Sequence, residues 1–170
     1  MKLTPISLPT CLKMAKELSE LDRPEEQSTW IYDLSMHTQC ETFAIEHRDY
    51  YHGFVVIKKG AFGIWLLWIS LQPQSRDGVI GALATYMALS YAFDEKKATW
   101  VMSDVFVDNI RSNKIHRALF TVNDKSRRIQ NKPVITYIMT EKRFRENVLY
   151  YRDHTINGVK RKDRKRITQS

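Results

Sequence analysis

Residues 64–83 read IWLLWISLQPQSRDGVIGAL and change character twice. The first part, Ile64–Leu71, is apolar at every position except Ser70, which is typical of a strand buried on both faces of a sheet. A polar stretch with a proline follows, and the apolar spacing of a helix begins at Val79. The sequence therefore predicts a central strand that leads through a loop into a helix.

The loop of this junction, Gln72–Gly81, has the features of an anion-binding site. The first turn of a helix exposes unpaired backbone N–H groups and the positive end of the helix dipole, which attract phosphate groups. Gly78 and Gly81 would let a ligand approach the backbone, and Arg76 could add a charge-assisted hydrogen bond. Asp77 would oppose an anion unless it caps the helix. A plain strand–helix connection without a ligand is the alternative interpretation.

Short strands joined by tight turns are predicted before the junction. The pattern alternates over about residues 41–51, turns at Tyr51–Gly53, forms a second strand to Lys58, turns at Lys59-Gly60 and enters the central strand at Phe62. Three strands in this order form an antiparallel meander. An edge strand over residues 2–8 and two helices, over about residues 10–21 and 29–37, are expected before it.

Helices and strands alternate after the junction. The first helix is expected to end between Phe93 and Lys97, a strand follows over residues 99–107, and Asp108-Asn109 caps a further helix. Lys132-Pro133 breaks the chain before a last strand, Val134–Met139. The predicted class is α+β, with one domain over residues 1–158. Its mixed sheet is an antiparallel meander followed by β-α-β-α-β, with helices on both faces.

Composition limits the classes of protein that the chain can belong to. The 170 residues are 43% hydrophobic, which fits a folded domain with a core, and the four tryptophans (Trp30, Trp65, Trp68 and Trp100) are expected to lie in it. No apolar run is long enough to span a membrane, and the N-terminus does not resemble a signal peptide, so a cytoplasmic protein is expected. Cys11, Cys40 and the histidines lack zinc-ligand spacing, so no metal is expected.

The positive charge is concentrated at the C-terminus. The chain has a net charge of +8, and residues 141–170 contain 10 Lys/Arg against 4 Asp/Glu. The segment 159–170 is expected to be a basic, disordered tail, which could bind nucleic acid or an acidic protein through charge alone. Basic side chains earlier in the chain could extend that surface: Arg111, Lys114, Arg117, Lys125, Arg127 and Arg128. A solvated tail without a partner is the alternative.

The order of elements, together with two short motifs, resembles the GCN5-related N-acetyltransferase (GNAT) superfamily over about residues 41–140. The family's central strand leads into a loop of the type Q/R-x-x-G-x-G/A, and this chain has PQSRDGVIGAL at residues 73–83. The family's later motif is N-x-x-A/S-x-x-L-Y, and this chain has NIRSNKIH at residues 109–116. Here Gly78 and Gly81 are three positions apart rather than two, and His116 replaces the tyrosine.

The resemblance implies an acyl-CoA-dependent N-acyltransferase that uses acetyl-CoA as substrate and an amine of unknown identity as acceptor. In the family, the backbone of the central strand pairs with the pantetheine arm and the loop amides hold the pyrophosphate. The implied acetyl-CoA-binding positions are Ile69, Ser70, Leu71, Arg76, Asp77, Gly78, Val79, Ile80, Gly81 and Asn109. A catalytically inactive protein of this fold, which binds nucleic acid or an acidic partner, is the competing hypothesis.

Acetyl transfer to an amine needs a proton acceptor for the amine and a proton donor for the leaving thiolate. The predicted central strand has no carboxylate, so the candidate bases are Glu46 and either Asp104 or Asp108. His116 is the candidate acid, because an imidazole titrates near neutral pH. A structural role for Asp104 and a solvent-facing position for His116 are the alternatives. His47 and His52 either lie on the surface or face the same groove.

Overall fold

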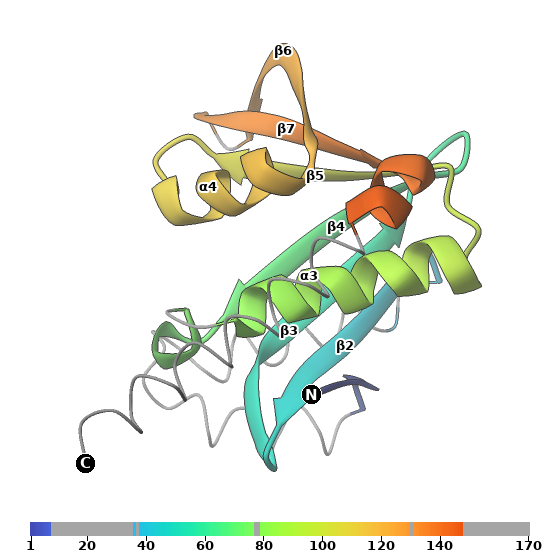
Figure 1. Ribbon diagram of the computed structural model, residues 1–170, viewed down its shortest axis with the longest axis vertical. Coiled ribbons are helices and arrows are strands. Elements are labelled where there is room, and N and C mark those ends of the chain that lie inside the picture. The colour runs from blue at the N-terminus through green and yellow to red at the C-terminus, as the bar shows by residue number, and fades with distance from the viewer. Residues whose placement is uncertain (8–35, 37, 77–78, 130, 148–170) are drawn as a thin grey trace, which may run out of the picture.

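The computed structural model describes residues 1–7, 36, 38–76, 79–129 and 131–147. In this part of the chain one seven-stranded sheet has the order β1-β2-β3-β4-β5-β7-β6 (Figure 1). The strands are β1 (Lys2–Pro5), β2 (Cys40–His47), β3 (Tyr50–Lys59), β4 (Ile64–Leu71), β5 (Trp100–Phe106), β6 (Thr121–Ile129) and β7 (Lys132–Thr140). The β4–β5 pair is parallel, and the other neighbouring strands are antiparallel.

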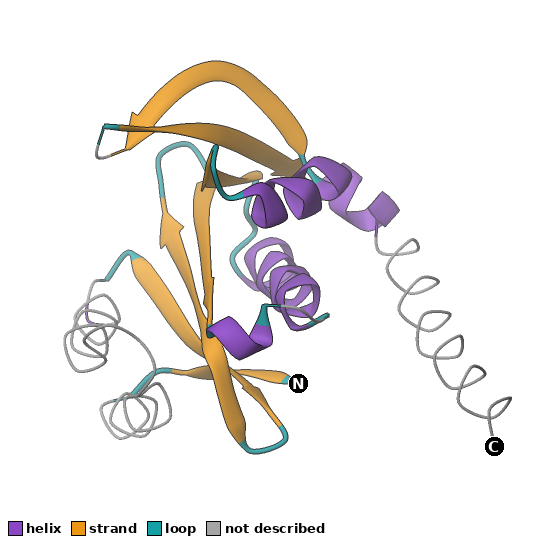
Figure 2. Ribbon diagram, turned by 90° about the vertical axis from the view of Figure 1, so that its left-hand side faces the viewer, coloured by secondary structure: helices purple, strands orange, loops and turns teal. Residues whose placement is uncertain are grey.

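Helices cover one face of this sheet in the described part of the chain. The crossover between β4 and β5 contains a short 3-10 helix (Pro73–Ser75), then α3 (Ile80–Ser90), which continues as a π-helical turn (Tyr91–Glu95). Helix α4 (Ile110–Leu119) joins β5 to β6, and residues 141–147 form a further helical segment. All of these helices except the 3-10 turn lie on the same side (Figure 2). The predicted α+β class, the meander and the parallel crossover are confirmed.

Some predicted segments lie outside the described residues. These are most of the two N-terminal helices, at about residues 10–21 and 29–37, and the basic tail at 159–170. Helices were predicted on both faces of the sheet, and those that the structure describes, apart from the 3-10 turn, lie on one face (Figure 2). The edge strand expected at residues 2–8 is present as β1, which pairs with β2 only, as Pro5 favours.

The first hairpin turn was predicted in the wrong place. The turn is at Arg48 and Asp49, which have φ angles of 53° and 63° and therefore form the tight two-residue connection that suits a twisted hairpin. Gly53 lies inside β3, opposite Leu71 of β4. A Cβ atom at Gly53 would lie 2.0 Å from the carbonyl oxygen of Ser70, and its φ is 144°. The glycine thus permits the close approach of β3 and β4 rather than a turn.

Strand β6 was missed, so the true order after the junction is β-α-β-α-β-β. Its sequence, TVNDKSRRI, is mostly polar, and its residues do not alternate between apolar and polar as those of a half-buried strand do. It lies at the edge of the sheet, where charged side chains are common because they discourage pairing with other chains. The break expected at Lys132-Pro133 is also wrong, since both residues belong to β7. Pro133 is close to the start of that strand, where its missing N–H is tolerated.

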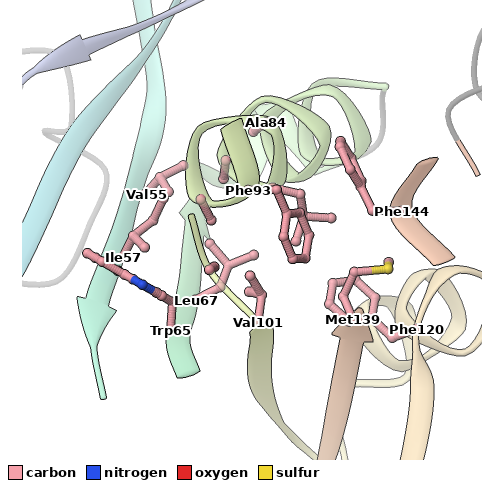
Figure 3. Packing of buried hydrophobic residues seen from close by; sticks show 14 of the residues in the cluster. Val55, Ile57, Trp65, Leu67, Ala84, Phe93, Val101, Phe120, Met139 and Phe144 are labelled. Atoms are coloured by element: carbon pink, nitrogen blue, oxygen red, sulfur yellow. The ribbon is translucent and has the colours of Figure 1, made fainter. Parts of the chain in front are cut away.

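The core lies between the sheet and the helices (Figure 3). It includes Val55, Ile57, Leu67, Val101 and Met139 from the strands, with Ala84, Phe93, Phe120 and Phe144 from the helical side. Trp65 is buried in it, as predicted. Trp68 and Trp100 are 39% and 45% exposed, because strand alternation turns them to the face opposite α3, and Trp30 is outside the described residues.

We predict that Gly53→Ala destabilises the protein by about 2–4 kcal/mol, because the added methyl group meets the Ser70 carbonyl and the φ angle disfavours alanine. Urea unfolding followed by circular dichroism measures the change. Gly81→Ala is the matched control, since its Cβ would meet only the Cδ1 atom of Leu71, at 3.0 Å. The control should change stability by less than about 1 kcal/mol. Equal effects of the two substitutions would contradict this explanation of Gly53.

Candidate functional site

Strands β4 and β5 separate in the middle of the sheet. Their parallel pairing covers three residue pairs and ends at Leu66–Met102. Beyond this point β4 continues to pair with β3 as far as Leu71, and β5 continues to pair with β7 as far as Phe106. The two strands diverge in Figure 1. Each therefore presents backbone N–H and C=O groups toward a gap, where an extended ligand with amide groups could add hydrogen bonds.

The loop after β4 is fastened to β3. The backbone N–H of Gln72 donates to the carbonyl of His52 at 3.0 Å. The ring of His52 lies 3.2 Å from the carbonyl of His47 and 2.8 Å from the hydroxyl of Ser75. A carbonyl can only accept, so Nε2–H of His52 donates to it, and Nδ1 hydrogen-bonds with the Ser75 hydroxyl. His52 therefore links the loop to the end of β2, and the sequence did not predict this role.

Helix α3 begins next to Leu71, the last residue of β4. Its N-cap residue, Val79, makes no side-chain hydrogen bond to the helix, so no side chain at that position occupies the first-turn N–H groups. Arg76 is exposed and donates from Nε to the Leu71 carbonyl at 3.0 Å. Gly81 packs closely on Leu71. The predicted loop residues Asp77 and Gly78 are outside the described part of the chain.

The loop matches the family motif better when it is aligned on Gly81. Arg76 then takes the Q/R position, five residues before the last glycine, and Val79 stands at the first glycine position. Val79 has a φ of −78° and a ψ of −6°, which a side chain adopts without strain. A valine at this position therefore requires no backbone strain.

Helix α4 is attached to the far side of the gap by a polar network. Asn109 caps it, accepting from the backbone N–H of Ser112 at 3.1 Å, as predicted. Asn113, which the sequence did not single out, donates to the carbonyls of Phe106 at 2.8 Å and Asn109 at 3.0 Å. Its Oδ1 accepts from the buried hydroxyl of Tyr137 at 2.8 Å. These bonds fix the start of α4 against the ends of β5 and β7.

His116 is half-buried in α4 and faces β5. Its Nδ1 lies 2.9 Å from the carbonyl of Ser112, and its Nε2 lies 3.1 Å from Oγ of the buried Ser103. The ring stacks on Phe120 at a centroid distance of 4.9 Å and lies 5.0 Å from the ring of Tyr137. Burial lowers the pKa of His116 below 6.5, and the hydrogen bond to the Ser112 carbonyl offsets part of this effect. His116 is thus a neutral imidazole near pH 7.

The two candidate carboxylate bases are already bonded to other groups. Glu46 forms an ion pair with Lys2 at 3.2 Å and accepts from the hydroxyl of Thr4 at 3.1 Å. Asp104 pairs with Arg127 at 3.0 Å and accepts from Thr136 at 2.5 Å. Because neighbouring residues of a strand point to opposite faces, Asp104 and Ser103 lie on opposite sides of β5. The structure therefore brings neither carboxylate next to His116.

Within the described residues, no group of three or more His, Cys, Asp or Glu side chains could hold a metal ion. The helices in this part of the chain are too short or too polar to span a membrane.

Several solved structures have the same fold. One is a chimera of spermidine N-acetyltransferase SpeG from Vibrio cholerae and hSSAT, with a TM-score of 0.69 and 13% identity over 85% of this chain and 99% of that one. The V. cholerae spermidine N-acetyltransferase in complex with CoA and spermine has a TM-score of 0.65 and 10% identity over 84% and 96% of the two chains. A candidate acetyltransferase from T. thermophilus has a TM-score of 0.69 and 17% identity, over 85% and 87%.

The sequence matches no family model and no curated protein. The similarity to solved structures nevertheless establishes the architecture. The chain has the fold of the GNAT acetyltransferases, and the resemblance found in its sequence is confirmed at that level.

We predict that His116 makes the protein less stable in mild acid. Its pKa is lower in the folded than in the unfolded chain, so the unfolded chain binds more protons below about pH 6.5 and stability falls as the pH decreases. His116→Gln should reduce this loss, measured by urea unfolding at several pH values between about 7 and 5. The pKa of His47 is also lowered, first by desolvation, so His47→Gln is the control for a second contribution. An unchanged pH dependence in His116→Gln would refute the assignment.

Proposed function

We propose that this protein is an acyl-CoA-dependent N-acyltransferase, which transfers the acetyl group of acetyl-CoA to an amine. The observation that carries the proposal is the gap between β4 and β5, which leads directly to the start of α3. A gap with free backbone groups suits the amide-containing pantetheine arm, and the helix start suits the pyrophosphate. The gap and the helix start follow one another in the chain, as the pantetheine arm and the pyrophosphate follow one another in CoA.

The proposed cofactor site has three parts. The backbone of Ile69, Ser70 and Leu71 lies beyond the last β4–β5 pair and would bind the pantetheine arm. The loop and first turn of α3, with Arg76, Asp77, Gly78, Val79, Ile80 and Gly81, would hold the pyrophosphate. Asn109, which caps α4 near the end of β5, would border the site on its other side.

The acceptor is proposed to be an amine whose identity is open. The name of the V. cholerae neighbour, a spermidine N-acetyltransferase bound to CoA and spermine, supports an amine as the class of acceptor. Glu46 and Asp104 could each serve as its base only after giving up the ion pairs with Lys2 and Arg127. The basic tail falls outside the described residues, so no contact supports the competing hypothesis of a nucleic-acid or acidic-protein binder.

We predict that calorimetric titration of the full chain with acetyl-CoA and with desulfo-CoA gives dissociation constants in the micromolar range, about −8 kcal/mol in free energy. Gly81→Asp should weaken both by at least about tenfold, because it places a negative charge and extra atoms at the start of α3 beside Leu71. The loss should be the same for both ligands, since the substitution acts at the phosphate end.

Thr140→Asp is the matched control for the added charge. Thr140 lies opposite Trp100 at the other end of β5, and its hydroxyl accepts from the N–H of Arg143, a bond that an aspartate can also make. This variant should bind both ligands as the natural sequence does. Absence of binding, together with salt-sensitive binding of DNA or RNA that is lost on deletion of residues 159–170, would overturn the proposal.

A further inference from the structure

We propose that Ser103 and His116 form a proton relay, in which His116 is the base and acts on the reacting groups through the Ser103 hydroxyl. The inference rests on the proposed function and assigns its proton acceptor. Ser103 Oγ lies 3.1 Å from Nε2 of His116, although the two residues belong to different elements and are 13 positions apart. This reverses the role expected for His116 from the sequence, where it was the candidate acid.

The hydrogen bonds determine which ring nitrogen can accept a proton. Nδ1 of His116 lies 2.9 Å from the backbone carbonyl of Ser112, its nearer partner, and 3.3 Å from the hydroxyl of the same residue; the carbonyl cannot donate. In the neutral ring Nδ1 therefore carries the hydrogen, and Nε2 has the free lone pair. The Ser103 hydroxyl donates to that lone pair, so its oxygen is left to accept a hydrogen bond from another group.

The relay lies where the two central strands separate. The last β4–β5 pair is Leu66–Met102, and Ser103 is the next residue on β5. A CoA molecule whose pyrophosphate is at the start of α3 would run its arm from Leu71 back along β4, toward that point of separation. The sulfur is at the end of the arm, so the thioester would lie close to Ser103.

The surroundings of His116 favour the neutral ring, because burial disfavours the imidazolium. The side chains that pack on its ring are aromatic, from Phe120 and Tyr137, and Tyr137 is the titratable group among its partners. The hydroxyl of Tyr137 donates to Asn113. On β5 the charged neighbour of Ser103, Asp104, is on the opposite face and is paired with Arg127. On α4 itself, Lys114 and Arg117 are exposed.

The reaction balances with this one relay. The amine nitrogen attacks the thioester carbonyl carbon, a C–N bond forms, and the C–S bond breaks when the tetrahedral intermediate collapses. The proton lost by the amine passes to Ser103 Oγ while the Ser103 proton passes to His116 Nε2. The imidazolium then returns one proton by the same path to the thiolate, which leaves as CoA thiol. No other proton donor is required, and Ser103 forms no covalent bond to the acetyl group.

Histidine NMR of the full chain tests the relay without knowledge of the acceptor. With CoA bound, the thiol proton can pass through Ser103 to His116 and leave a thiolate–imidazolium pair, so the pKa of His116 should rise by about one pH unit, a tenfold change in proton affinity. Desulfo-CoA, which has no sulfur, should leave it unchanged. The resonance is assigned by its loss in His116→Gln. Ser103→Ala should still bind CoA in calorimetry, and most of the CoA-dependent rise should disappear in this variant.

Ser90→Ala is the matched control, because it removes the same hydroxyl from the last turn of α3 and should retain the full response. Equal pKa values of His116 with CoA and with desulfo-CoA, when both bind, would overturn the relay but leave the proposed function standing. Binding of neither ligand would overturn both. The intact mass after incubation with acetyl-CoA gives a further test. An added acetyl group that Ser103→Ala lacks would also overturn the relay, since it would make Ser103 a nucleophile.

Discussion

The hydrogen bonding between β4 and β5 stops after three residue pairs, and the candidate site depends on that stop. The two strands do not rejoin because each is held along its length by another partner. Strand β4 pairs with β3 from Trp65 to Leu71, and β5 pairs with β7 from Trp100 to Phe106. The sheet is in effect two antiparallel halves joined at one end, and the natural twist of strands separates them at the other.

Each half of the sheet brings its own polar attachments to the gap. On the β4 side, His52 and the backbone of Gln72 hold the loop that leads to α3, and Gly53 lets β3 come close enough to do so. On the β5 side, Asn113 holds the start of α4. Buried polar groups of this kind are costly to leave unpaired, so they fix position more strictly than apolar packing does. The helix that would meet phosphate and the helix that carries His116 are therefore positioned independently.

The sequence predicted those parts of the fold that depend on residues close together in the chain. The apolar run at Ile64–Leu71 and the Asn109 cap predicted the central strand and the start of α4, because each depends on a few adjacent residues. Strand β6 was missed because an edge strand needs no apolar face. Gly53 was misread as a turn, since the reason for a glycine there is a strand that comes later in the chain. The candidate site also has a part that the sequence could predict and a part that it could not. Its loop is one continuous segment, whereas Ser103 and His116 meet only in the folded chain.

The change from tyrosine to histidine at the end of the second motif alters the chemistry available there. A phenol titrates near pH 10 and is protonated at neutral pH, so it can donate a proton but is a poor acceptor. A buried neutral imidazole behaves in the opposite way. When its Nδ1–H donates to the Ser112 carbonyl, the other ring nitrogen, Nε2, can only accept a proton. Because Glu46 and Asp104 are held in ion pairs, His116 is a better candidate for the proton acceptor than either of them. The histidine at residue 116 and the absence of a carboxylate on β4 thus fit the proposed relay, in which a single imidazole would first take the proton of the amine and then give it to the sulfur.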